Sequence, residues 1–262
     1  MKYHIAVNPR LVPKGTGTLA HAIAQFGLPD CCDIIYRGRN VVARLSTEGL
    51  ILKAYKYPDF FKGLIYRWFR PPKSRRTYSN ALRLREMGIP TPEPAFAIEC
   101  YRRTSGLGKS YYCCFDLKGW QELRGIEQRP DFDKLAKALA EFIFDIHCKS
   151  VLMKDMSPGN VLFNERPDGG YDFALVDINR MEFDVREWGR LLENFQCLLD
   201  TEDGTVAVAR HYNLILERNR MQIDTDDFES YVRRIYRDFF NRKQRQRRLK
   251  KRLGLTKKHH SR

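Results

Sequence analysis

The sequence lacks any run of 18 or more apolar residues, so we expect no membrane-spanning helix. Its first 15 residues also lack the sustained apolar stretch of a secretory signal. Seven cysteines are present, but their number is odd and none forms a C-x-x-C pair. This pattern predicts free thiols in a reducing compartment, and therefore a cytoplasmic protein.

Acidic residues are missing from the C-terminal end. Residues 241–262 contain eleven Lys or Arg and no Asp or Glu, whereas the formal net charge of the whole chain is +15. The other 240 residues therefore carry only +4, so the basicity belongs largely to a tail. A hydrophobic fraction of 43% in 262 residues is typical of a globular protein with one large domain or two lobes.

Strand patterns dominate the first 115 residues. In residues 32–57, turn signals at 38–40 and 47–49 separate three apolar or β-branched runs, which predicts a three-stranded antiparallel meander. Lys53 interrupts the third run, on the same face as Ile51 and Tyr55 by period-two alternation. A helix over 77–87 and extended segments at 95–101 and 110–115 complete this predicted lobe.

Helical patterns take over after residue 130. Residues 131–150 have apolar side chains at helical spacing, and Asp131 is placed to cap the start of that helix. Three more helices are predicted at 186–199, 206–219 and 226–240. We thus expect an α+β chain of three parts: a β-rich lobe (1–115), a mainly helical lobe (116–240) and a basic tail (241–262).

The segment "VLMKDMSPGNVLF", residues 151–163, sets Asp155 five residues before Asn160 with turn formers between them. A predicted hairpin follows, because Asp168 and Gly169 separate two apolar runs. With these two as the central turn residues, Asn160 lies opposite Asp177, although the register could slip by one or two residues.

This pairing predicts a metal site with a catalytic carboxylate beside it. An amide oxygen and a carboxylate at the open end of a hairpin suit Mg²⁺, which prefers hard oxygen ligands. Asp155 would lie next to the pair, where its role would be to orient or deprotonate an attacking hydroxyl.

The order of strand lysine, helix, "IH", "KDMSPGN" and "LVDIN" resembles the protein-kinase-like superfamily. More narrowly, "SRRTYSNALRLREMGIPTPEPAFAIE", "MKDMSPGNVLF" and "FALVDINRMEF" resemble the lipopolysaccharide kinase family. Members of that family phosphorylate Kdo or heptose sugars of the lipid A core in Gram-negative bacteria. The resemblance covers about residues 30–200.

The resemblance implies a bilobal kinase that uses ATP and Mg²⁺ to phosphorylate a sugar of the lipopolysaccharide core, at the inner face of the inner membrane. It also assigns a role to each matching residue. Lys53 should grip the α- and β-phosphates of ATP and the turn of Gly38, Arg39 and Asn40 should lie over them, while Asp155 should be the catalytic base and Asn160 and Asp177 should bind Mg²⁺.

Several positions depart from the protein-kinase pattern. The turn at 38–40 is no Gly-x-Gly-x-x-Gly loop, Met153 stands where a His is usual, and Asn179 replaces the Gly after the metal-binding Asp. Ser157 replaces a Lys, which favours a sugar or small-molecule acceptor over a protein. The helix at 77–87 has no acid before Glu86, so the usual ion-pair partner of the strand lysine is missing or supplied from elsewhere.

Two rival functions stay open from the sequence: another small-molecule or protein kinase of the same fold, and a pseudokinase that binds anionic membrane or RNA. The basic segments 60–76 and 241–262 fit an anionic membrane surface better than nucleic acid, because the implied substrate is itself in the membrane. The alternatives are a buried connector for the first segment and a disordered solubilising end for the second. His147 is predicted to be structural, and Lys154 to contact phosphate or solvent.

Overall fold

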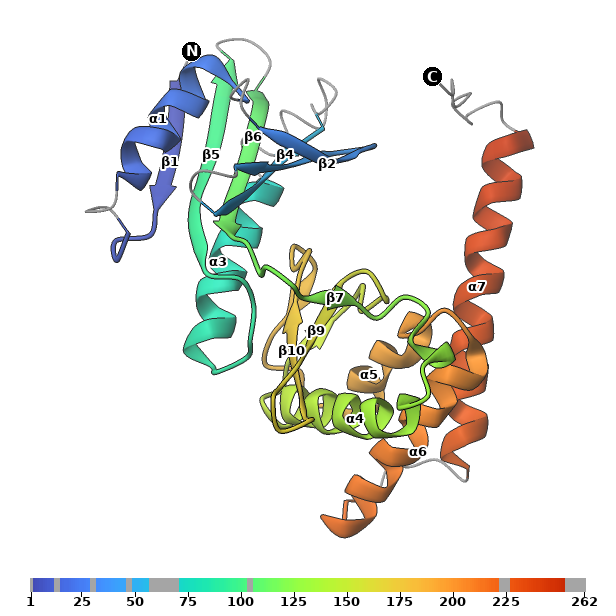
Figure 1. Ribbon diagram of the computed structural model, residues 1–262. Helices are drawn as coiled ribbons and strands as arrows, with labels where there is room; N and C mark the ends of the chain where they lie inside the picture. Colours follow the sequence, from blue (N-terminus) through green and yellow to red (C-terminus); the bar gives the residue numbers. More distant parts are fainter. Residues whose placement is uncertain are drawn as a thin grey trace. The chain divides into compact units, whose positions relative to one another are not determined.

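The computed structural model describes residues 2–11, 15–28, 32–45, 49–56, 71–102, 106–221 and 227–252. The chain divides into two compact units (Figure 1). Unit 1 consists of Met1–Trp120 together with Ala174–Met181, and unit 2 consists of Gln121–Phe173 together with Glu182–Arg262. The segment that carries Asp177 therefore belongs to unit 1, although it follows the predicted hairpin in the sequence.

Unit 1 is built on a six-stranded antiparallel sheet with the strand order β1-β5-β6-β4-β3-β2. The predicted meander is present as its last three strands, and the β1 strand was not predicted. The strands are β1 (Lys2–Val7), β2 (Asp33–Arg37), β3 (Val41–Leu45), β4 (Leu50–Tyr55), β5 (Pro94–Arg102) and β6 (Gly106–Phe115).

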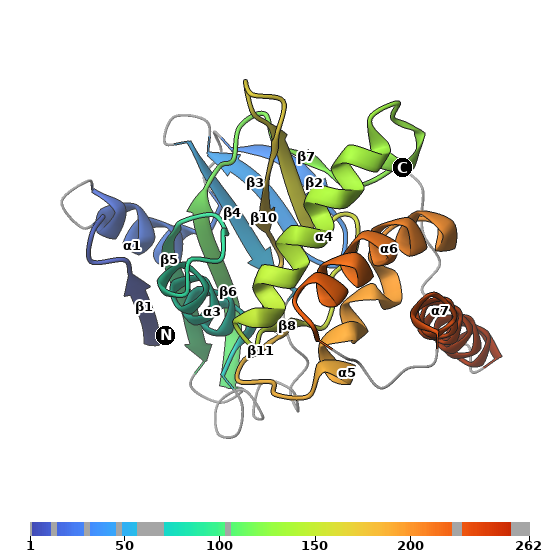
Figure 2. The ribbon, with the colours of Figure 1, turned by 90° about the horizontal axis from the view of Figure 1, so that it is seen from below.

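Two helices cover opposite faces of this sheet, α1 (Thr16–Phe26) and α3 (Lys73–Glu86) (Figure 2). Successive side chains of a strand point to opposite faces, so Phe96 packs in the cluster under α1 and Ala97 in the cluster under α3. On β4, Tyr55 belongs to the α3 cluster. Lys53, two residues earlier on the same strand, therefore points to the α3 side of the sheet.

Helix α3 begins four residues before the predicted start at Thr77. The prediction placed the preceding residues in the aromatic and basic segment, but Pro72 is the N-cap of the helix and has φ −55°. Proline pre-sets this backbone, and the first turn is closed by the Arg76 N–H, which donates to the Pro72 carbonyl at 3.0 Å. Helical spacing of apolar residues, which begins only later, missed this turn.

Unit 2 is mainly helical, and its core lies between α4 (Phe132–Cys148) and α6 (Glu202–Arg218), which lie side by side (Figure 2). Leu135, Leu139, Ile143 and Ile146 of α4 are fully buried, as their helical spacing predicted. The remaining elements of the chain are β7 (Gln121–Glu122), η2 (Ile126–Gln128), β8 (Leu152–Met153), β9 (Val161–Glu165), β10 (Tyr171–Leu175), β11 (Met181–Glu182), α5 (Trp188–Leu191), η3 (Leu192–Cys197) and α7 (Phe228–Arg252).

The side chain of Asp131 does not cap α4, contrary to the prediction. Its two carboxylate oxygens each accept a hydrogen bond of 2.8 Å from Arg129, and one also accepts the hydroxyl of Tyr171 at 2.5 Å. The Arg129 guanidinium and the Tyr171 hydroxyl hold the pKa of this carboxyl well below its usual range. The charged partner competes successfully with the backbone N–H groups of the helix start.

The turn between β9 and β10 has three residues rather than the predicted two. Arg166 and Gly170 form its closing pair, with a 2.8 Å bond from Arg166 N–H to the Gly170 carbonyl. Gly169 has φ +77°, which suits a type I turn followed by a bulge. The register predicted for the hairpin is therefore one residue out.

Two helical regions after residue 185 differ from the prediction. The helix predicted at 186–199 is split into the short α5 and the 3₁₀-helical η3. The basic tail, with a disordered end as one of its predicted alternatives, continues α7 as a helix up to Arg252. No helix in the described residues is both long and apolar enough to cross a membrane.

Candidate active site

Lys53 forms an ion pair with the metal-ligand candidate Asp177, with 2.7 Å between Nζ and Oδ1. Both side chains are largely shielded, with 17% and 34% of their surfaces exposed. Within the described residues Asp177 thus takes the place of the helix acid that the sequence lacks. Helix α3, whose only acid is its last residue Glu86, contributes no carboxylate to this lysine.

Asp177 has an unusual backbone and a polarised carboxylate. Its φ is +53°, a left-handed conformation that Asp tolerates better than most residues. Burial tends to raise the pKa of this carboxyl, but the Lys53 ammonium and a 2.8 Å hydrogen bond from Asn179 Nδ2 outweigh it and lower the pKa. Both partners contact Oδ1, so Oδ2 is left without a contact from the described residues.

Asn179 explains one departure from the protein-kinase pattern. Where that pattern has a glycine, this side chain donates back to Oδ1 of Asp177 and fixes the rotation of the carboxylate. The Asp177 carbonyl also accepts the backbone N–H of Asn179 at 2.9 Å. Sequence reasoning noted the replacement but not this contact.

A second lysine, Lys73, acts on Asp177, and two arginines act on Lys73; sequence reasoning missed Lys73 and Arg180 as site residues. Lys73, at the start of α3, has a lowered pKa because of burial, the nearby Arg39 and, more weakly, Arg180; Asp177 opposes the shift. Arg39 belongs to the predicted phosphate turn and Arg180 closes the "DINR" sequence. Unit 1 therefore places Lys53 and Lys73 near the Asp177 carboxylate and Arg39 and Arg180 near Lys73, which is a charge pattern suited to a polyphosphate.

The turn of Gly38, Arg39 and Asn40 is closed by its own hydrogen bonds. Gly38 N–H donates to the Asn40 carbonyl at 3.0 Å, and Asn40 Oδ1 accepts the backbone N–H of Lys56 at 3.2 Å. A side chain at Gly38 would meet the ring of Tyr36, because a Cβ there would lie 2.4 Å from its hydroxyl oxygen. The glycine therefore allows close packing within the turn.

Asp155 and Asn160 lie together in unit 2, on the loop that follows β8. Asn160 Nδ2 donates to the carbonyl of Asp155 at 2.8 Å, and Ser157 N–H donates to the same carbonyl at 2.9 Å. The amide of Asn160 is thereby oriented with its Oδ1 left over. The Asp155 carboxylate is half-buried and has no hydrogen bond or ion pair within the described residues.

A chain of buried side chains supports this loop from below. Asn194 Nδ2 donates to the carbonyl of Met153 at 2.6 Å, so its Oδ1 must accept from His147 Nε2 at 2.9 Å. The other ring nitrogen, Nδ1, then accepts the hydroxyl of Tyr212 at 2.7 Å. His147 thus has the structural role that was predicted, although Asn194 makes the contact with the loop.

His147 should make the protein less stable at mildly acidic pH. Burial lowers its pKa to about 4 despite the hydrogen bond with Asn194. In the unfolded chain this histidine binds a proton with a pKa near 6.5, whereas in the folded protein it stays neutral down to about pH 4. Its contribution to the free energy of unfolding is therefore complete above pH 6.5 and is lost as the pH falls toward 4. We expect wild type to lose about 2 kcal/mol more of its unfolding free energy than His147→Gln between roughly pH 7.5 and 5.

Urea unfolding at the two pH values measures this difference. The control is His211→Gln, which removes a partly exposed histidine of the same unit that contacts Asp133. Equal pH dependence in wild type and His147→Gln would show that the ring is not held neutral by the fold.

Lys154 is exposed and forms an ion pair with Glu182, which also binds Arg190. Its predicted contact with phosphate stays a prediction. Of the other predicted site residues, Lys53 and Asp177 are brought together in unit 1, and Asp155 and Asn160 in unit 2. The predicted strand pairing of Asn160 with Asp177 rested on the register that is one residue out, so only their shared binding of Mg²⁺ stays a prediction.

Comparison with known proteins supports the same fold and chemistry. The profile of the "Lipopolysaccharide kinase (Kdo/WaaP) family" matches residues 54–200, which include Asp155, Asn160 and Asp177. No curated protein matches the chain. The matched residues make up more than half of the chain, so the match establishes the family.

Two solved structures resemble the chain. WaaP in complex with acyl carrier protein shares 15% identity over 90% of this chain and 99% of its own, with a TM-score of 0.58. Rio2 kinase from Chaetomium thermophilum, in a complex with ADP, Mg²⁺ and phosphoaspartate, shares 14% identity over 84% of this chain and 66% of its own, with a TM-score of 0.42. The WaaP similarity shows a common protein-kinase-like fold, as predicted. The chain therefore belongs to the lipopolysaccharide kinase (Kdo/WaaP) family and is a kinase that acts on the lipopolysaccharide core.

Proposed function

We propose that this kinase transfers the γ-phosphoryl group of ATP to a hydroxyl of a Kdo or heptose residue of the lipopolysaccharide core, with Mg²⁺, at the cytoplasmic face of the inner membrane. One observation carries the proposal. The three predicted site residues Asp155, Asn160 and Asp177 each keep a side-chain oxygen without a contact from the described residues. Hydrogen bonds or ion pairs hold the rest of each residue, either its other polar side-chain atoms or its backbone.

The residues present fit a magnesium ion. Asp177 Oδ2 and Asn160 Oδ1 are hard oxygen atoms on side chains whose orientations are fixed by hydrogen bonds. Mg²⁺ binds through one or two such protein oxygens and completes its shell with water and phosphate oxygens. Bound there, the ion would neutralise charge on the transferring phosphoryl group.

The cations of unit 1 would hold the triphosphate. Lys53 lies on a strand, where its position is set by the sheet, and Lys73 lies at the start of α3 with its ammonium partly buried. Arg39 is supplied by the turn that is expected to lie over the phosphates. Binding of the nucleotide would offer Lys53 phosphate oxygens in exchange for part of its contact with Asp177.

Asp155 would orient the sugar hydroxyl and accept its proton as the phosphoryl group is attacked. Its backbone carbonyl is held by Asn160 and Ser157, so the carboxylate is directed without being neutralised by a partner. Because phosphoryl transfer has a loose transition state, most of the acceleration would come from this positioning and from charge neutralisation.

The acceptor is tested with purified protein, γ-labelled ATP, Mg²⁺ and two deacylated core oligosaccharides, one ending in Kdo and one extended with heptose. We expect label on one of them and not on casein, which serves as a general protein acceptor. Label on casein or on the kinase alone would disprove the sugar assignment. A failure to bind Mg-ATP at all, measured by calorimetry, would disprove both kinase readings and leave the pseudokinase.

Helix α7 supplies a surface suited to the membrane. Its first turns are docked, with Phe228, Val232 and Tyr236 buried and Arg237 bound to Glu202. Residues 241–252 are all exposed, contain eight Lys or Arg and no acid, and form no ion pair within the described chain. Like charges four residues apart repel each other, so contact with anionic lipid would stabilise this part of the helix.

Of the other predicted membrane segment, residues 57–70 lie outside the described residues. Arg75, near its end, is already paired, because it makes two hydrogen bonds of 2.8 Å to the buried carboxylate of Glu99. The basic end of α7 therefore carries the membrane proposal.

Replacing Arg247, Arg248, Lys250 and Lys251 by Gln should weaken binding to phosphatidylglycerol vesicles by about a hundredfold to a thousandfold, since each cation contributes about 1 kcal/mol. Vesicle sedimentation measures the effect, with phosphatidylcholine vesicles as the neutral comparison. The matched control replaces Gln244 and Gln246 by Ala on the same stretch. Unchanged sedimentation of the charge variant would exclude α7 as the membrane contact.

A further inference from the structure

The backbone around Asp177 is held at three points by unit 1. Leu175 N–H donates to the carbonyl of Pro90 at 2.9 Å, and the Thr91 hydroxyl donates to the carbonyl of Leu175 at 2.7 Å. On the other side of Asp177, Asn80 Nδ2 donates to the carbonyl of Ile178 at 2.7 Å. Asp177 thus lies between two residues, Leu175 and Ile178, whose backbone groups are hydrogen-bonded to other parts of unit 1.

Helix α3, which carries the donor Asn80, is itself fixed to the sheet of unit 1. It is tied to β5 by the Arg75–Glu99 pair and to β4 by a 2.8 Å hydrogen bond between the hydroxyls of Tyr55 and Thr77. Because the Thr77 hydroxyl donates to the Lys73 carbonyl, Tyr55 is the donor in that bond. Motion of Asn80 would therefore require motion of the helix.

The loop that carries Thr91 is fixed by the end of α3. Gly88 has φ +69°, its N–H donates to the Arg85 carbonyl, and Ile89 N–H donates to the Leu84 carbonyl at 2.8 Å. This is a Schellman ending, in which Ile89 is buried. The "GIPTP" sequence therefore ends the helix and brings Pro90 and Thr91 against Leu175, the last residue of β10, two residues before Asp177.

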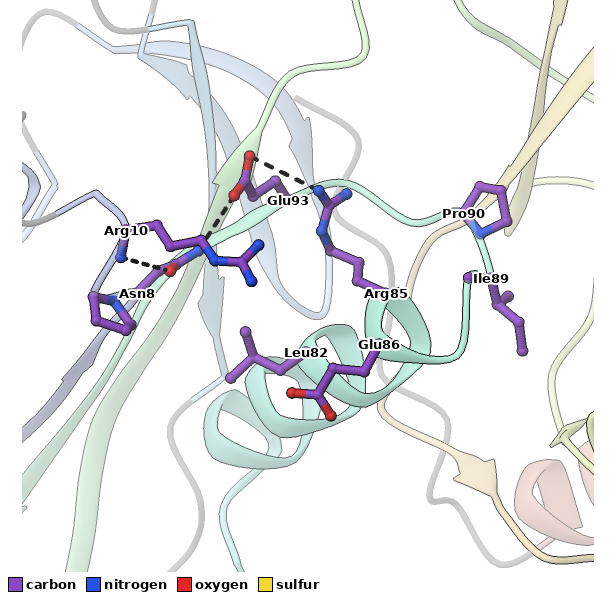
Figure 3. A pocket seen from close by; sticks show the side chains of 10 residues that line it. Asn8, Arg10, Leu82, Arg85, Glu86, Ile89, Pro90 and Glu93 are labelled. Atoms are coloured by element: carbon purple, nitrogen blue, oxygen red, sulfur yellow. Dashed lines mark hydrogen bonds and ion pairs between the residues drawn. The ribbon is translucent and has the colours of Figure 1, made fainter.

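The outer side of the same loop lines a hollow of about 580 Å³ on unit 1 (Figure 3). There Arg85 points from α3 toward Glu93, and its Nη1 donates to the carbonyl of Thr91 at 3.2 Å. Glu86, on the same helix, points away from this contact (Figure 3). The Thr91 carbonyl thus accepts a hydrogen bond from Arg85, while the Thr91 hydroxyl donates to Leu175.

We propose that Asn80 and Thr91 are positioning residues that set the carboxylate of Asp177 for metal binding. The left-handed φ of +53° at Asp177 is less favourable than the ordinary backbone regions even for Asp, so the surroundings are needed to stabilise it. The three hydrogen bonds on either side enforce it. Helix α3 is thereby linked to the site by the hydrogen bond from Asn80 to the backbone beside Asp177, and not by a helix acid paired with Lys53. The proposal rests on the function proposed above, in which Asp177 is a metal ligand.

The test measures Mn²⁺ binding in the presence of ADP by electron paramagnetic resonance, together with kcat at varied Mg²⁺. Thr91→Val and Asn80→Leu, which keep side-chain volume and remove the donors, should each weaken Mn²⁺ binding about fivefold to tenfold, the ratio of one lost hydrogen bond. The Mg²⁺ concentration for half-maximal rate should rise by the same factor. Thr91→Ser, which keeps the hydroxyl, should restore the wild-type values.

Two control variants separate positioning from general damage. Asn213→Ala changes a partly exposed helical residue and Glu86→Gln an exposed one, and we expect Mn²⁺ affinity within about twofold of wild type for both. Asn80 is only half-buried, so its variant remains informative if Thr91→Val proves too unstable to fold. If Asp177→Asn abolishes Mn²⁺ binding but Asn80→Leu and Thr91→Val leave it unchanged, the positioning proposal is wrong. If Asp177→Asn itself leaves Mn²⁺ binding unchanged, the proposed function is wrong as well.

Discussion

The variant Asp155→Asn is expected to lose sugar phosphorylation by about a hundredfold to ten-thousandfold in kcat, which is the usual contribution of a general base. The asparagine keeps the shape of the side chain and its ability to accept a hydrogen bond, but it does not accept the proton of the sugar hydroxyl. The backbone bonds from Asn160 and Ser157 go to the carbonyl of residue 155, so the loop should keep its conformation.

Binding of Mg-ATP should survive this change, since the proposed phosphate and metal contacts come from other side chains. Calorimetry with a nonhydrolysable ATP analogue measures that binding, and a labelled-phosphate assay measures kcat. The matched control is Asp238→Asn, which neutralises an exposed carboxylate on α7 of the same unit. A variant that keeps more than about a tenth of the wild-type kcat would show that Asp155 is not the base.

The variant Asp177→Asn is expected to lose metal-dependent transfer by about a thousandfold, and raising Mg²⁺ should not restore it. The substitution removes the only charged ligand proposed for the metal, so affinity for a divalent cation should collapse. It also leaves the Lys53 ammonium, which has 17% of its side-chain surface exposed, without its carboxylate. Removing one partner of a shielded ion pair is destabilising, so a lower melting temperature should accompany the loss.

A second ion pair on the same sheet separates these two effects. Asp116 bonds to Arg44 at 2.7 Å and has only 8% of its side chain exposed, so Asp116→Asn also breaks an ion pair of unit 1. We expect it to lower the melting temperature without the thousandfold loss of activity. If the two variants lose activity to the same degree, loss of stability rather than loss of a metal ligand explains the effect of Asp177→Asn.

The family assignment fixes the general activity, and these experiments concern its details. The chain is a kinase of the lipopolysaccharide core, so the open questions are the acceptor sugar, the metal and the location. The departures of the sequence from protein kinases now have physical explanations at two positions. Asn179 orients the carboxylate of Asp177, and the missing acid of α3 is replaced by the direct contact of Asp177 with Lys53.

Local patterns in the sequence were sufficient for the elements whose signals lie within a few residues. Period-two alternation put Lys53 on the correct face of β4, and helical spacing identified the buried side of α4. Turn formers identified the hairpin, but they left its register one residue out. The length of that turn depends on the left-handed φ of Gly169, which the Asp-Gly pair permits without requiring it.

By itself, then, the sequence determined the kinase fold, the loop from Asp155 to Asn160 and the place of Lys53 and Asp177 in the chain. Only the tertiary structure decided which partners these side chains take. Asp177 binds a lysine more than a hundred residues away, and Asn80 and Thr91 reach the backbone beside it from another part of the chain. Such contacts are set by how the sheet and α3 pack, and packing between distant segments leaves no periodic signal in the sequence.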